Sequence, residues 1–363
     1  MKAAVLRAPG QRMDIEDVRL DEPRAGEVLV RLVATGVCHT DYGPYHGDRA
    51  IKMPVVLGHE GAGVVEAVGP SVSTVAPGDH VVLASVPRCG KCGPCVIGRP
   101  YVCEVAASAR SAGTLLDGTT RLHAGSEPVA HFFSQSSFAE QAVVPEGAVV
   151  CVPNDAPLDK LAVLACGVST GLGAVFNAAS LSPGASMVMF GCGGVGLGAI
   201  IAADLSQAET VIAVDLVDEK LELARSFGAT HTINAGRGDA VQRVRELTGS
   251  GVEYAFEFVG NTRTVEQAVQ SLAPGGHAYI VGGLAPDTRI SFPAAGFLND
   301  KHVHGVTLGS VRAATDIPRY AGLYKKGRLP LDRLVTRRYS LEEVNAALDD
   351  LETASGRGVI CFT

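Results

Sequence analysis

Four cysteines occur within fifteen residues of the chain, a density that is typical of a metal site. They are Cys89, Cys92, Cys95 and Cys103. Four thiolates complete the tetrahedral coordination that zinc adopts in structural sites and leave no open position for a reactant. Gly90, Gly93, Pro94 and Gly98 between them allow the tight turns that convergence of the sulfurs requires. The spacing therefore predicts a structural zinc lobe at about residues 88–104, with the chemistry elsewhere.

Disulfides and a nucleic-acid-binding zinc ribbon are the two alternatives for this cluster. The chain has nine cysteines, an odd number, and its opening MKAAVLRAPG lacks the apolar run of a signal peptide. We therefore expect a cytoplasmic protein with reduced thiols, which favours a metal over disulfides. The lobe has only three basic residues and the chain has a net charge of −7, so the sequence predicts no nucleic-acid partner.

Three further candidate metal ligands are dispersed along the chain. Cys38 lies in G-V-C-H-T-D, His59 in G-H-E and Cys166 in L-A-C-G-V-S-T-G. Two thiolates and one imidazole would leave the fourth position of a zinc ion open, which suits a Lewis acid that binds an alcohol and lowers its pKa. Taken singly, each is equally well explained as a buried cysteine or a satisfied histidine. Spacing alone does not bring the three together.

A glycine-rich segment, G-C-G-G-V-G, follows an apolar run at 186–190 and precedes a helical pattern. This order is typical of dinucleotide binding: Gly191 permits the tight turn, Gly193 lets the pyrophosphate approach, and Gly196 lets helix and strand pack closely. With Gly194 and Val195, the loop would hold the pyrophosphate at the helix N-terminus, where free N–H groups favour anions. The alternative is a strand–helix turn that binds nothing.

Asp215 is the residue that points to NAD rather than NADP. It ends the next apolar run, nineteen residues after Gly196. A carboxylate there accepts hydrogen bonds from the ribose hydroxyls and repels a 2′-phosphate. Leu216 and Val217 follow, so no arginine stands there to hold such a phosphate. An ordinary turn residue at a strand end is the alternative.

Length and composition indicate the number of domains and the class of protein. A chain of 363 residues is expected to form two domains, and 47% apolar with 19% charged residues is a globular composition. We find no apolar run long enough to span a membrane. The mild acidity argues against nucleic-acid and anionic-membrane partners.

The hydrophobic patterning changes near residue 165. Before it, short β-branched runs between glycine and proline turns predict an antiparallel, barrel-like domain. After it, apolar runs alternate with helical patterns, which predicts a doubly wound parallel sheet. The early strands are expected at 28–33, 63–68 and 80–83, the later ones at 186–190, 210–215, 254–259 and 278–281, and a last one at 358–362. Helices are expected at 194–206, 218–227, 239–248, 262–271, 317–326 and 341–353.

Taken together, these motifs resemble those of the zinc-dependent medium-chain alcohol dehydrogenases. The resemblance covers nearly all of the chain, and the motifs occur in the family's order. The complete lobe is similar to the branch of dimeric animal enzymes, glutathione-linked formaldehyde dehydrogenases and bacterial aryl-alcohol dehydrogenases. The resemblance implies an α/β fold: an NAD-binding Rossmann domain with a doubly wound parallel sheet at 168–307, and a mostly-β GroES-like catalytic domain at 1–167 and 308–363.

The resemblance also implies roles around the second metal. Cys38, His59 and Cys166 match the ligands of a catalytic zinc. Thr40 matches the hydroxyl that takes the proton from the alcohol. Asp41 matches the acid that hydrogen-bonds the ligand histidine and fixes its tautomer. A carboxylate behind the zinc, thought to assist ligand exchange, is matched by Glu60.

Cofactor contacts follow from the same resemblance. His39 and Arg357 match residues on the pyrophosphate, and Lys220 matches a contact to the adenosine ribose. Val259 is expected at the cofactor site as well. Without the family, the three basic residues would be taken for ordinary surface charges.

Two positions depart from the family pattern. Many relatives carry a proton-relay histidine where this chain has Gly43; His46, three residues on, either replaces it or is an exposed loop histidine. Many relatives also carry a large aromatic residue where this chain has Ser85. Phe132 and Phe133 match positions in the substrate channel. A roomier pocket with phenylalanine walls favours bulky or aromatic alcohols over ethanol.

The sequence thus predicts an NAD-dependent zinc alcohol dehydrogenase that transfers hydride reversibly between a primary alcohol and NAD. We expect NAD and two Zn²⁺ per chain as cofactors, in a homodimer or homotetramer. One alternative oxidises S-hydroxymethyl thiol adducts of formaldehyde. Another holds NAD tightly and uses an external electron acceptor. The third, of a different class, is a zinc-stabilised nucleotide-binding protein without turnover.

Overall fold

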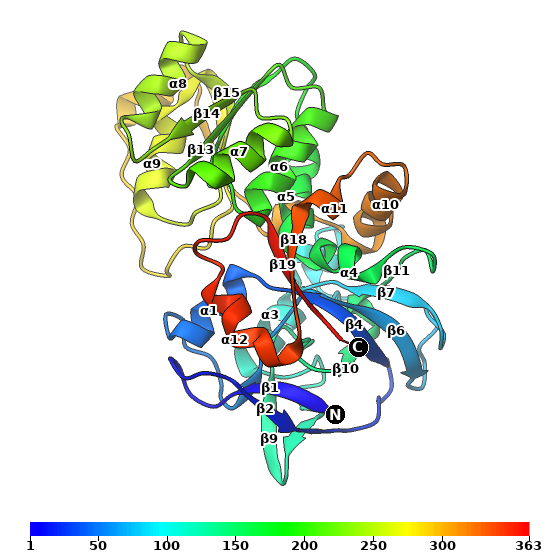
Figure 1. Cartoon of the computed structure of the whole chain (residues 1–363). Coiled ribbons are helices and arrows are strands. Elements are labelled where there is room, and N and C mark those ends of the chain that lie inside the picture. Colours follow the sequence, from blue (N-terminus) through cyan, green and yellow to red (C-terminus); the bar gives the residue numbers. More distant parts are fainter. Residues whose placement is uncertain (363) are drawn as a thin grey trace. The chain divides into compact units, whose positions relative to one another are not determined.

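The computed structural model describes residues 1–362, which divide into two compact units. One unit combines Met1–Cys166 with the chain from Arg312 onward, and the other is Gly167–Val311. Figure 1 shows the elements of both. Each unit is described by itself below.

The first unit is built on two sheets in which most pairings are antiparallel. One sheet has the order β2 (Asp14–Asp17), β1 (Lys2–Leu6), β5 (Val55–Val56), β9 (Glu127–His131), β8 (Leu122–Ala124), β3 (Arg19–Leu20). The other has the order β11 (Val149–Cys151), β7 (His80–Leu83), β6 (Gly61–Val68), β4 (Glu27–Gly36), β19 (Arg357–Cys361), β18 (Val335–Tyr339), with β10 (Gln141–Pro145) paired to β4.

Helices of the first unit have four to nine residues, except α10, which has 13. They are α1 (His39–His46), α2 (Gly93–Val96), α3 (Glu104–Ala112), α4 (Leu158–Leu161), α10 (Ala313–Lys325), α11 (Leu331–Leu334) and α12 (Val344–Asp349), with 3₁₀ turns at Pro100–Val102, Glu146–Ala148, Ala162–Ala165 and Leu341–Glu343. Residues 28–33 form part of β4, and 63–68 part of β6, as predicted. The helix expected at 341–353 ends earlier, at Asp349.

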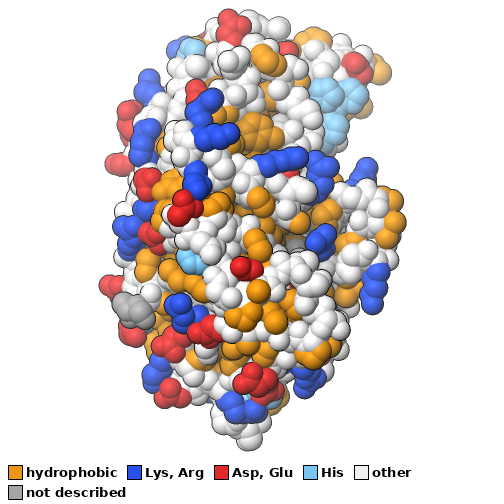
Figure 2. Space-filling model, turned by 90° about the vertical axis from the view of Figure 1, so that its right-hand side faces the viewer, with side chains coloured by type: hydrophobic (Ala, Val, Ile, Leu, Met, Phe, Trp, Pro, Cys, Tyr) orange, Lys and Arg blue, Asp and Glu red, His pale blue; other side chains and the backbone are white. Residues whose placement is uncertain are grey.

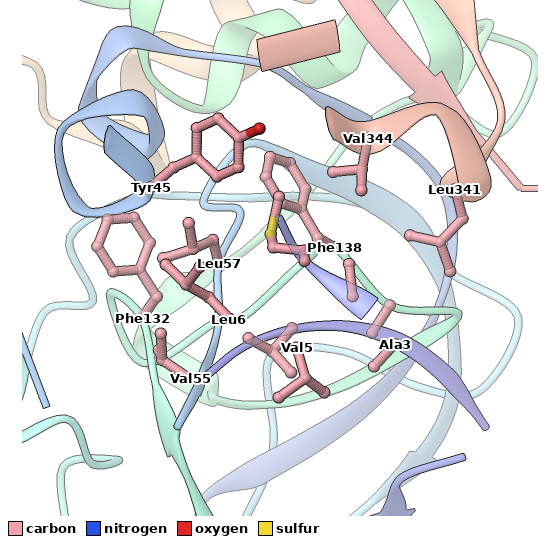
Figure 3. Packing of buried hydrophobic residues seen from close by; sticks show 14 of the residues in the cluster. Ala3, Val5, Leu6, Tyr45, Val55, Leu57, Phe132, Phe138, Leu341 and Val344 are labelled. Atoms are coloured by element: carbon pink, nitrogen blue, oxygen red, sulfur yellow. The ribbon is translucent and has the colours of Figure 1, made fainter. Parts of the chain in front are cut away.

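Two apolar cores hold this unit together. Alternate residues of β4 (Val28, Val30 and Leu32) are buried on one face, because side chains of a strand alternate between its two faces. The second core joins β1 to α1, α12 and the segment after β9, as Figure 3 shows for Tyr45, Leu57, Phe132 and Val344 among others. This core fixes α1, which carries several candidate site residues.

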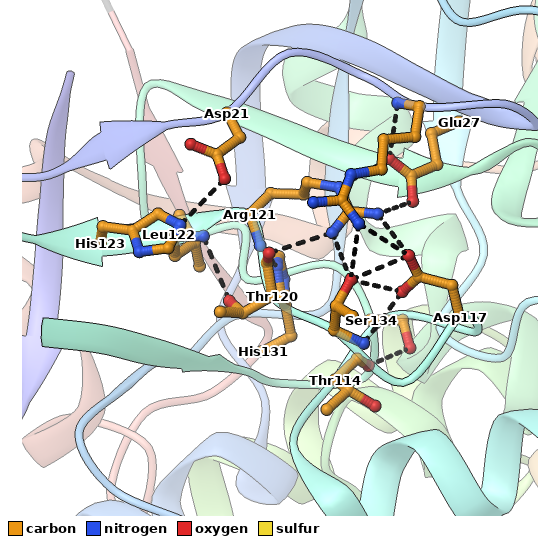
Figure 4. Close-up of polar contacts among 12 residues, drawn as sticks. Asp21, Glu27, Thr114, Asp117, Thr120, Arg121, Leu122, His123, His131 and Ser134 are labelled. Atoms are coloured by element: carbon orange, nitrogen blue, oxygen red, sulfur yellow. Dashed lines mark hydrogen bonds and ion pairs between the residues drawn. The ribbon is translucent and has the colours of Figure 1, made fainter.

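A buried arginine fastens the segment after α3 to the start of β4. The Arg121 side chain is fully buried; its Nε and Nη2 donate to the two Glu27 oxygens at 2.9 and 2.6 Å, and Nη2 also donates to Asp117 at 2.6 Å (Figure 4). Its backbone N–H donates to Nε2 of the buried His131 at 3.1 Å. A buried charge needs such pairing, so the network holds this segment in one conformation.

The second unit is a six-stranded sheet whose pairings are all parallel. The order is β14 (His231–Asn234), β13 (Thr210–Asp215), β12 (Ser186–Phe190), β15 (Val252–Glu257), β16 (Leu272–Ile280), β17 (His302–Gly305). The chain starts in the middle at β12 and fills one side, then the other, which is the order of a Rossmann sheet. The predicted fold class is therefore confirmed for this part.

Helices of the second unit follow the predicted alternation. They are α5 (Gly167–Gly173), α6 (Gly194–Leu205), α7 (Asp218–Ser226), α8 (Ala240–Thr248) and α9 (Thr262–Gln270), with a π-helix at Ala174–Ala179 and 3₁₀ turns at Ala294–Asn299 and Leu308–Ser310. The strand expected at 254–259 lies two residues earlier. The strands β14 and β17 were not predicted, because their short, histidine-containing sequences lack a clear apolar run.

No single helix in residues 1–362 is long and apolar enough to cross a membrane; only a bent pair, 158–165 and 167–179, reaches that length and composition. On the face drawn in Figure 2, lysine and arginine side chains are interspersed with aspartate and glutamate side chains.

Candidate active site and metal centres

The dispersed metal-ligand candidates lie together in the first unit. Cys38, His59, Glu60 and Cys166 are all buried, and one ligand atom from each lies within 4.8 Å of the others. Cys38 precedes α1, His59 and Glu60 lie between β5 and β6, and Cys166 follows the turn Ala162–Ala165. Three separate loops of the fold therefore supply the donors, which is why their spacing in the sequence carries no signal.

Asp41 orients the site through one buried carboxylate. Its Oδ1 lies 2.8 Å from His59 Nδ1 and accepts from the Gly58 N–H at 3.1 Å, while its Oδ2 accepts from the Cys38 N–H at 3.1 Å. Burial, the largest single cause, lowers the pKa of His59, but the charge and the hydrogen bond of Asp41, with the charge of Cys38, together raise that pKa well above its usual range. The contact to Nδ1 leaves Nε2 as the nitrogen available to a ligand.

The donor set fits a zinc ion with one open position. His59 Nε2 is buried and has no hydrogen-bond partner among residues 1–362, which is the state of an atom placed for a metal. The Cys166 thiol hydrogen-bonds Cys38 and holds the pKa of Cys38 well below its usual range, although burial opposes this. The same hydrogen bond and burial raise the pKa of Cys166. Two thiols and one imidazole are ligands that zinc prefers.

Glu60 and Arg357 form a buried ion pair beside these donors. Arg357 Nη2 donates to Glu60 Oε2, and both side chains are almost fully buried. Burial lowers the pKa of Arg357, but the negative charges of Glu60, Cys38 and Cys166 together raise it above its usual range. Gly36 makes room for the pair, because a Cβ at that position would overlap the Glu60 carboxylate. Arg357 was expected on the cofactor pyrophosphate; the contact that the structure gives it is with Glu60.

Phe132 and Phe133 flank the ligand histidine. The His59 ring stacks on Phe133 with centroids 4.9 Å apart and meets Phe132 edge-on at 5.7 Å. Phe133 has φ +53°, a left-handed conformation that non-glycine residues rarely adopt. Ser85 is buried, and its N–H donates to the Ala165 carbonyl at 3.3 Å, next to Cys166. All three expected pocket residues therefore lie near the donor cluster in the same unit.

Sequence reasoning missed the buried polar segment that follows Phe133. Gln135 Oε1 accepts from the Gly61 N–H at 2.7 Å and its Nε2 donates to the Leu83 carbonyl at 3.2 Å. Ser137 Oγ lies 2.7 Å from Thr35 Oγ1. These bonds tie the segment that follows the phenylalanines to β4, β6 and β7. The only signal in the sequence is a polar stretch, S-Q-S-S, between apolar runs.

Also missed was Arg110, whose guanidinium carbon lies 5.2 Å from the Phe133 ring centroid. Such a cation–π contact holds a flexible side chain at one place on the ring. Arg110 belongs to the last turn of α3, and nothing in its local sequence links it to residue 133.

The four-cysteine lobe forms a second donor cluster. The sulfurs of Cys89, Cys92, Cys95 and Cys103 all lie within 4.8 Å of one another. The short helix α2 and the start of α3 bring them together, with Cys92 Sγ 3.8 Å from Cys103 Sγ. Backbone N–H groups, that of Cys95 foremost, lower the pKa of Cys92 to about 6. Four convergent sulfurs in a pair of tight turns fit a closed tetrahedral zinc site.

The glycine loop joins β12 to α6 in the second unit. Gly191 has φ +98°, and its N–H donates to the Val214 carbonyl at 2.9 Å. A Cβ on Gly196 would overlap the Gly191 carbonyl, whereas a Cβ on Gly193 would meet open space. The loop backbone is therefore accessible at Gly193, ahead of the N-terminus of α6, and tightly packed at Gly196. Gly194 and Val195 are the first two residues of that helix.

Asp215 stands at the end of β13 and is bound to the loop. Its Oδ2 accepts from the Cys192 N–H at 2.7 Å, and its Oδ1 accepts from the N–H groups of Leu216 and Val217 at 2.8 and 3.1 Å. These bonds fix the carboxylate beside the glycine loop while it stays partly exposed. Val259 is half exposed and lies against Gly191, so it borders the same loop.

Four further residues were expected at the site: His39, Thr40 and Lys220, with His46 as a possible proton relay. His39 and Thr40 begin α1, and the His39 ring centroid lies 6.0 Å from that of Tyr42. Lys220 is a partly buried residue of α7, close enough for its charge to lower the pKa of Cys192, which burial raises. His46 is exposed, stacks on Tyr42 at 5.2 Å and has Nδ1 3.7 Å from Asp48, all within its own segment.

Comparison with known proteins gives consistent matches over the whole chain. The family model described as "Alcohol dehydrogenase GroES-like domain" matches residues 24–154, and the one described as "Zinc-binding dehydrogenase" matches residues 194–325. The S-(hydroxymethyl)glutathione dehydrogenase of Paracoccus denitrificans is 37% identical over 99% of both chains. The NDMA-dependent alcohol dehydrogenase of Amycolatopsis methanolica is 39% identical over 99% of this chain and 98% of its own.

The solved structures agree with these matches. The crystal structure of benzyl alcohol dehydrogenase from Acinetobacter calcoaceticus has a TM-score of 0.95 and 38% identity, and the match covers 100% of this chain and 99% of that one. The resemblance expected from the motifs is thereby confirmed, as is the pairing of a GroES-like with a Rossmann-type domain. This chain belongs to the family of zinc-dependent medium-chain alcohol dehydrogenases.

Proposed function

We propose that this zinc alcohol dehydrogenase oxidises bulky or aromatic primary alcohols with NAD and runs the reverse reduction at the same site. The observation that carries the proposal is the buried donor set of Cys38, His59 and Cys166 beside two phenylalanine rings. A zinc ion held by these three residues would polarise the alcohol oxygen and lower its pKa. The Gly167–Val311 unit would bind the nicotinamide cofactor that accepts the hydride.

The residues around the proposed catalytic zinc each have a role in this proposal. Thr40 takes the hydroxyl proton of the alcohol and passes it outward. Asp41 keeps His59 in the tautomer whose Nε2 faces the metal and makes that nitrogen more basic. The Glu60–Arg357 pair sits beside the donors as a balanced charge, and Glu60 is the carboxylate that approaches them when ligands exchange.

NAD is the cofactor that the second unit favours. The open backbone at Gly193 would take the pyrophosphate, and the partly exposed Asp215 carboxylate would accept hydrogen bonds from the adenosine ribose and repel a 2′-phosphate. Lys220 and Val259 are proposed as further contacts of the adenosine part and the loop. We propose His39 and Arg357 as the partners of the pyrophosphate from the catalytic domain.

Two zinc ions per chain are proposed, with different roles. The lobe of four cysteines would hold the first in a closed structural site, and the catalytic domain would hold the second with an open position. The catalytic domain is proposed to comprise residues 1–167 and 308–363, and the Rossmann domain 168–307. Metal analysis of the purified protein tests the number directly.

Two names among the relatives suggest other substrates or acceptors. One relative is an S-(hydroxymethyl)glutathione dehydrogenase and another is NDMA-dependent. The first alternative is a dehydrogenase of thiol adducts, and the second an enzyme that keeps NAD bound and passes electrons to an external acceptor. Buried Ser85 and the ring pair Phe132 and Phe133 favour the aromatic alcohol as the main proposal.

We also propose that the protein is a homo-oligomer and that it is located in the cytoplasm. Val96 and Ile97 of the lobe are 71% and 69% exposed, an apolar pair that a subunit interface would cover. All nine cysteines are free thiols in the structure, which suits a reducing compartment. Light scattering after gel filtration measures the subunit number.

The function is tested with a panel of alcohols and aldehydes in the presence of zinc, by following the absorbance of NADH. Benzyl alcohol, cinnamyl alcohol and ethanol separate pocket size from reaction type. A spectrum of the protein as purified reveals tightly bound NAD, and an assay with a nitroso acceptor reveals turnover that bypasses free NAD. Zinc-loaded protein with no NADH formation from any alcohol, and no bound cofactor, would contradict the proposal.

A further inference from the structure

An exposed ion pair joins the loops that follow β13 and β14, at the carboxyl edge of the parallel sheet. Arg237, in the loop after β14, donates from Nη2 to Oδ2 of Asp218, the first residue of α7. The two side chains are 72% and 51% exposed. Rossmann sheets bind their nucleotide outside the carboxyl ends of the strands. The pair therefore lies at the edge of the sheet where the second unit is proposed to bind NAD.

Asn234 fixes these two loops to each other. It is the register partner of Asp215 in the neighbouring strand. Its Nδ2 donates to the Leu216 carbonyl at 3.1 Å and to Asp218 Oδ1 at 2.7 Å. One oxygen of the Asp218 carboxylate is thus bound by Asn234 and the other by Arg237. The ion pair is therefore held next to the strand end that carries Asp215.

The place of a 2′-phosphate follows from the proposed role of Asp215. Because that carboxylate is proposed to bind the ribose hydroxyls, a phosphate on the 2′ oxygen would lie beside it, among the residues after β13. Leu216 and Val217 offer no positive charge there. The fold, however, brings Arg237 into contact with the third residue after Asp215. An arginine near this strand end accommodates the 2′-phosphate in Rossmann domains that bind NADP. In this chain Asp218 already neutralises that arginine.

We propose that Asp218 is a second specificity-determining residue for NAD: it keeps the Arg237 guanidinium engaged, so that this group does not bind the 2′-phosphate of NADP. The inference rests on the proposed binding of NAD at Asp215 and adds a residue to it. Asp215 excludes the phosphate by repulsion, and Asp218 excludes it by occupying the group that would attract it. Discrimination against a competing ligand is often achieved by leaving its charge unpaired.

Calorimetry with two nucleotides on the full-length, zinc-loaded protein tests this without turnover. Adenosine 5′-monophosphate and adenosine 2′,5′-bisphosphate differ only in the 2′-phosphate, and the wild type should bind the monophosphate more tightly. Asp218→Asn should shift the ratio of the two dissociation constants roughly 10-fold toward the bisphosphate, the lower end for a hydrogen bond to a charged group, because both side chains are exposed. Asparagine keeps an oxygen that accepts from Asn234 Nδ2, so the loops should stay joined.

Two further variants separate release of the arginine from loss of a negative charge. Arg237→Gln added to Asp218→Asn should remove the gain, whereas Lys220, also on α7, is present in both. The matched control is Glu246→Gln, which frees Arg243 from an exposed ion pair on α8, the helix that leads from this edge back to the start of β15. It changes the net charge equally and should leave the ratio unchanged. Added salt should reduce the gain, because exposed charges are screened.

The outcomes distinguish this inference from the proposed function. A gain that survives Arg237→Gln, or that Glu246→Gln produces as well, overturns the inference while NAD binding stands. Should repulsion by Asp215 keep the bisphosphate from binding measurably, the same variants are compared in the Asp215→Ser background, where the same shift is expected. An unchanged ratio in Asp218→Asn there also overturns the inference. Folded, zinc-loaded protein that binds neither nucleotide contradicts the proposed cofactor site itself. The ratio of kcat/KM for NADP and NAD should change in the same direction as the binding ratio.

Discussion

The Asp41 carboxylate lies 2.8 Å from Nδ1 of His59, and both side chains are fully buried. The same carboxylate accepts N–H groups from Cys38 and Gly58. One acid therefore sets the orientation of the histidine and of the two backbone segments that carry His59 and Cys38. This arrangement makes Asp41 the residue on which the geometry of the proposed catalytic zinc site depends most.

Asp41→Asn should weaken zinc binding at the catalytic site by about 10- to 100-fold, because an amide neither raises the basicity of His59 nor fixes its tautomer as a carboxylate does. Zinc content after dialysis against a weak chelator measures the effect. The control is Asp17→Asn, which alters an exposed ion pair with Lys2. Equal zinc retention by Asp41→Asn and the control would contradict this role.

The two proposed zinc sites should respond differently to loss of a thiol. Cys92→Ser should lower the free energy of unfolding and the yield of soluble protein, because a closed structural site contributes to folding. Cys166→Ser should abolish turnover while largely sparing the fold. Thermal unfolding and zinc content of both variants check this. One zinc per chain in well-folded wild-type protein would show that the assignment is wrong.

Cofactor choice should depend on Asp215. Asp215→Ser should weaken the use of NAD and relax discrimination against NADP, because the repulsion of the 2′-phosphate is lost. The bond from Cys192 N–H to Asp215 also goes, so the glycine loop should become less rigid. The ratio of kcat/KM for NAD and NADP is the measurement, with Glu219→Gln, an exposed acid of α7, as control. A wild-type preference for NADP would contradict this prediction.

Pocket size should depend on Ser85. Benzyl alcohol buries more apolar surface than ethanol, and about 100 Å² more at roughly 25 cal/mol per Å² is on the order of 2 kcal/mol. That is some tens-fold in kcat/KM if it is realised in the transition state. Ser85→Phe should reduce this preference by filling the space, whereas Ser85→Ala should keep it. Identical preferences in both variants would mean that Ser85 does not face the substrate.

Stability should fall in acid partly because of His131. Burial first, and the Arg121 charge next, lower the pKa of His131 to about 3. The unfolded chain, with a pKa near 6.5, therefore takes up the proton earlier as the pH falls. His131 should have no such effect above about pH 6.5, and stability should decline below it. Urea unfolding at pH 7 and pH 5 should differ less for His131→Gln than for wild type; an unchanged difference rules this out.

Local patterns in the sequence were sufficient for much of the fold. The runs at 186–190 and 210–215 form β12 and β13, because β-branched and aromatic residues between turns favour strands wherever they are buried. The place of the glycine loop between β12 and α6, and of Asp215 at the end of β13, also follows from the sequence, since these residues belong to one short strand–helix–strand unit. The four cysteines of the lobe converge within fifteen residues for the same reason.

Tertiary structure alone decided what surrounds the reacting groups. Cys38, His59 and Cys166 come from three loops far apart in the chain, so only packing of β5, β6 and α1 brings them together. Arg110 over Phe133 and Arg357 on Glu60 join residues 23 and 297 positions apart, and no period in the sequence encodes such contacts. Short-range signals reflect backbone preferences of neighbouring residues, whereas these contacts exist only once distant segments share a core.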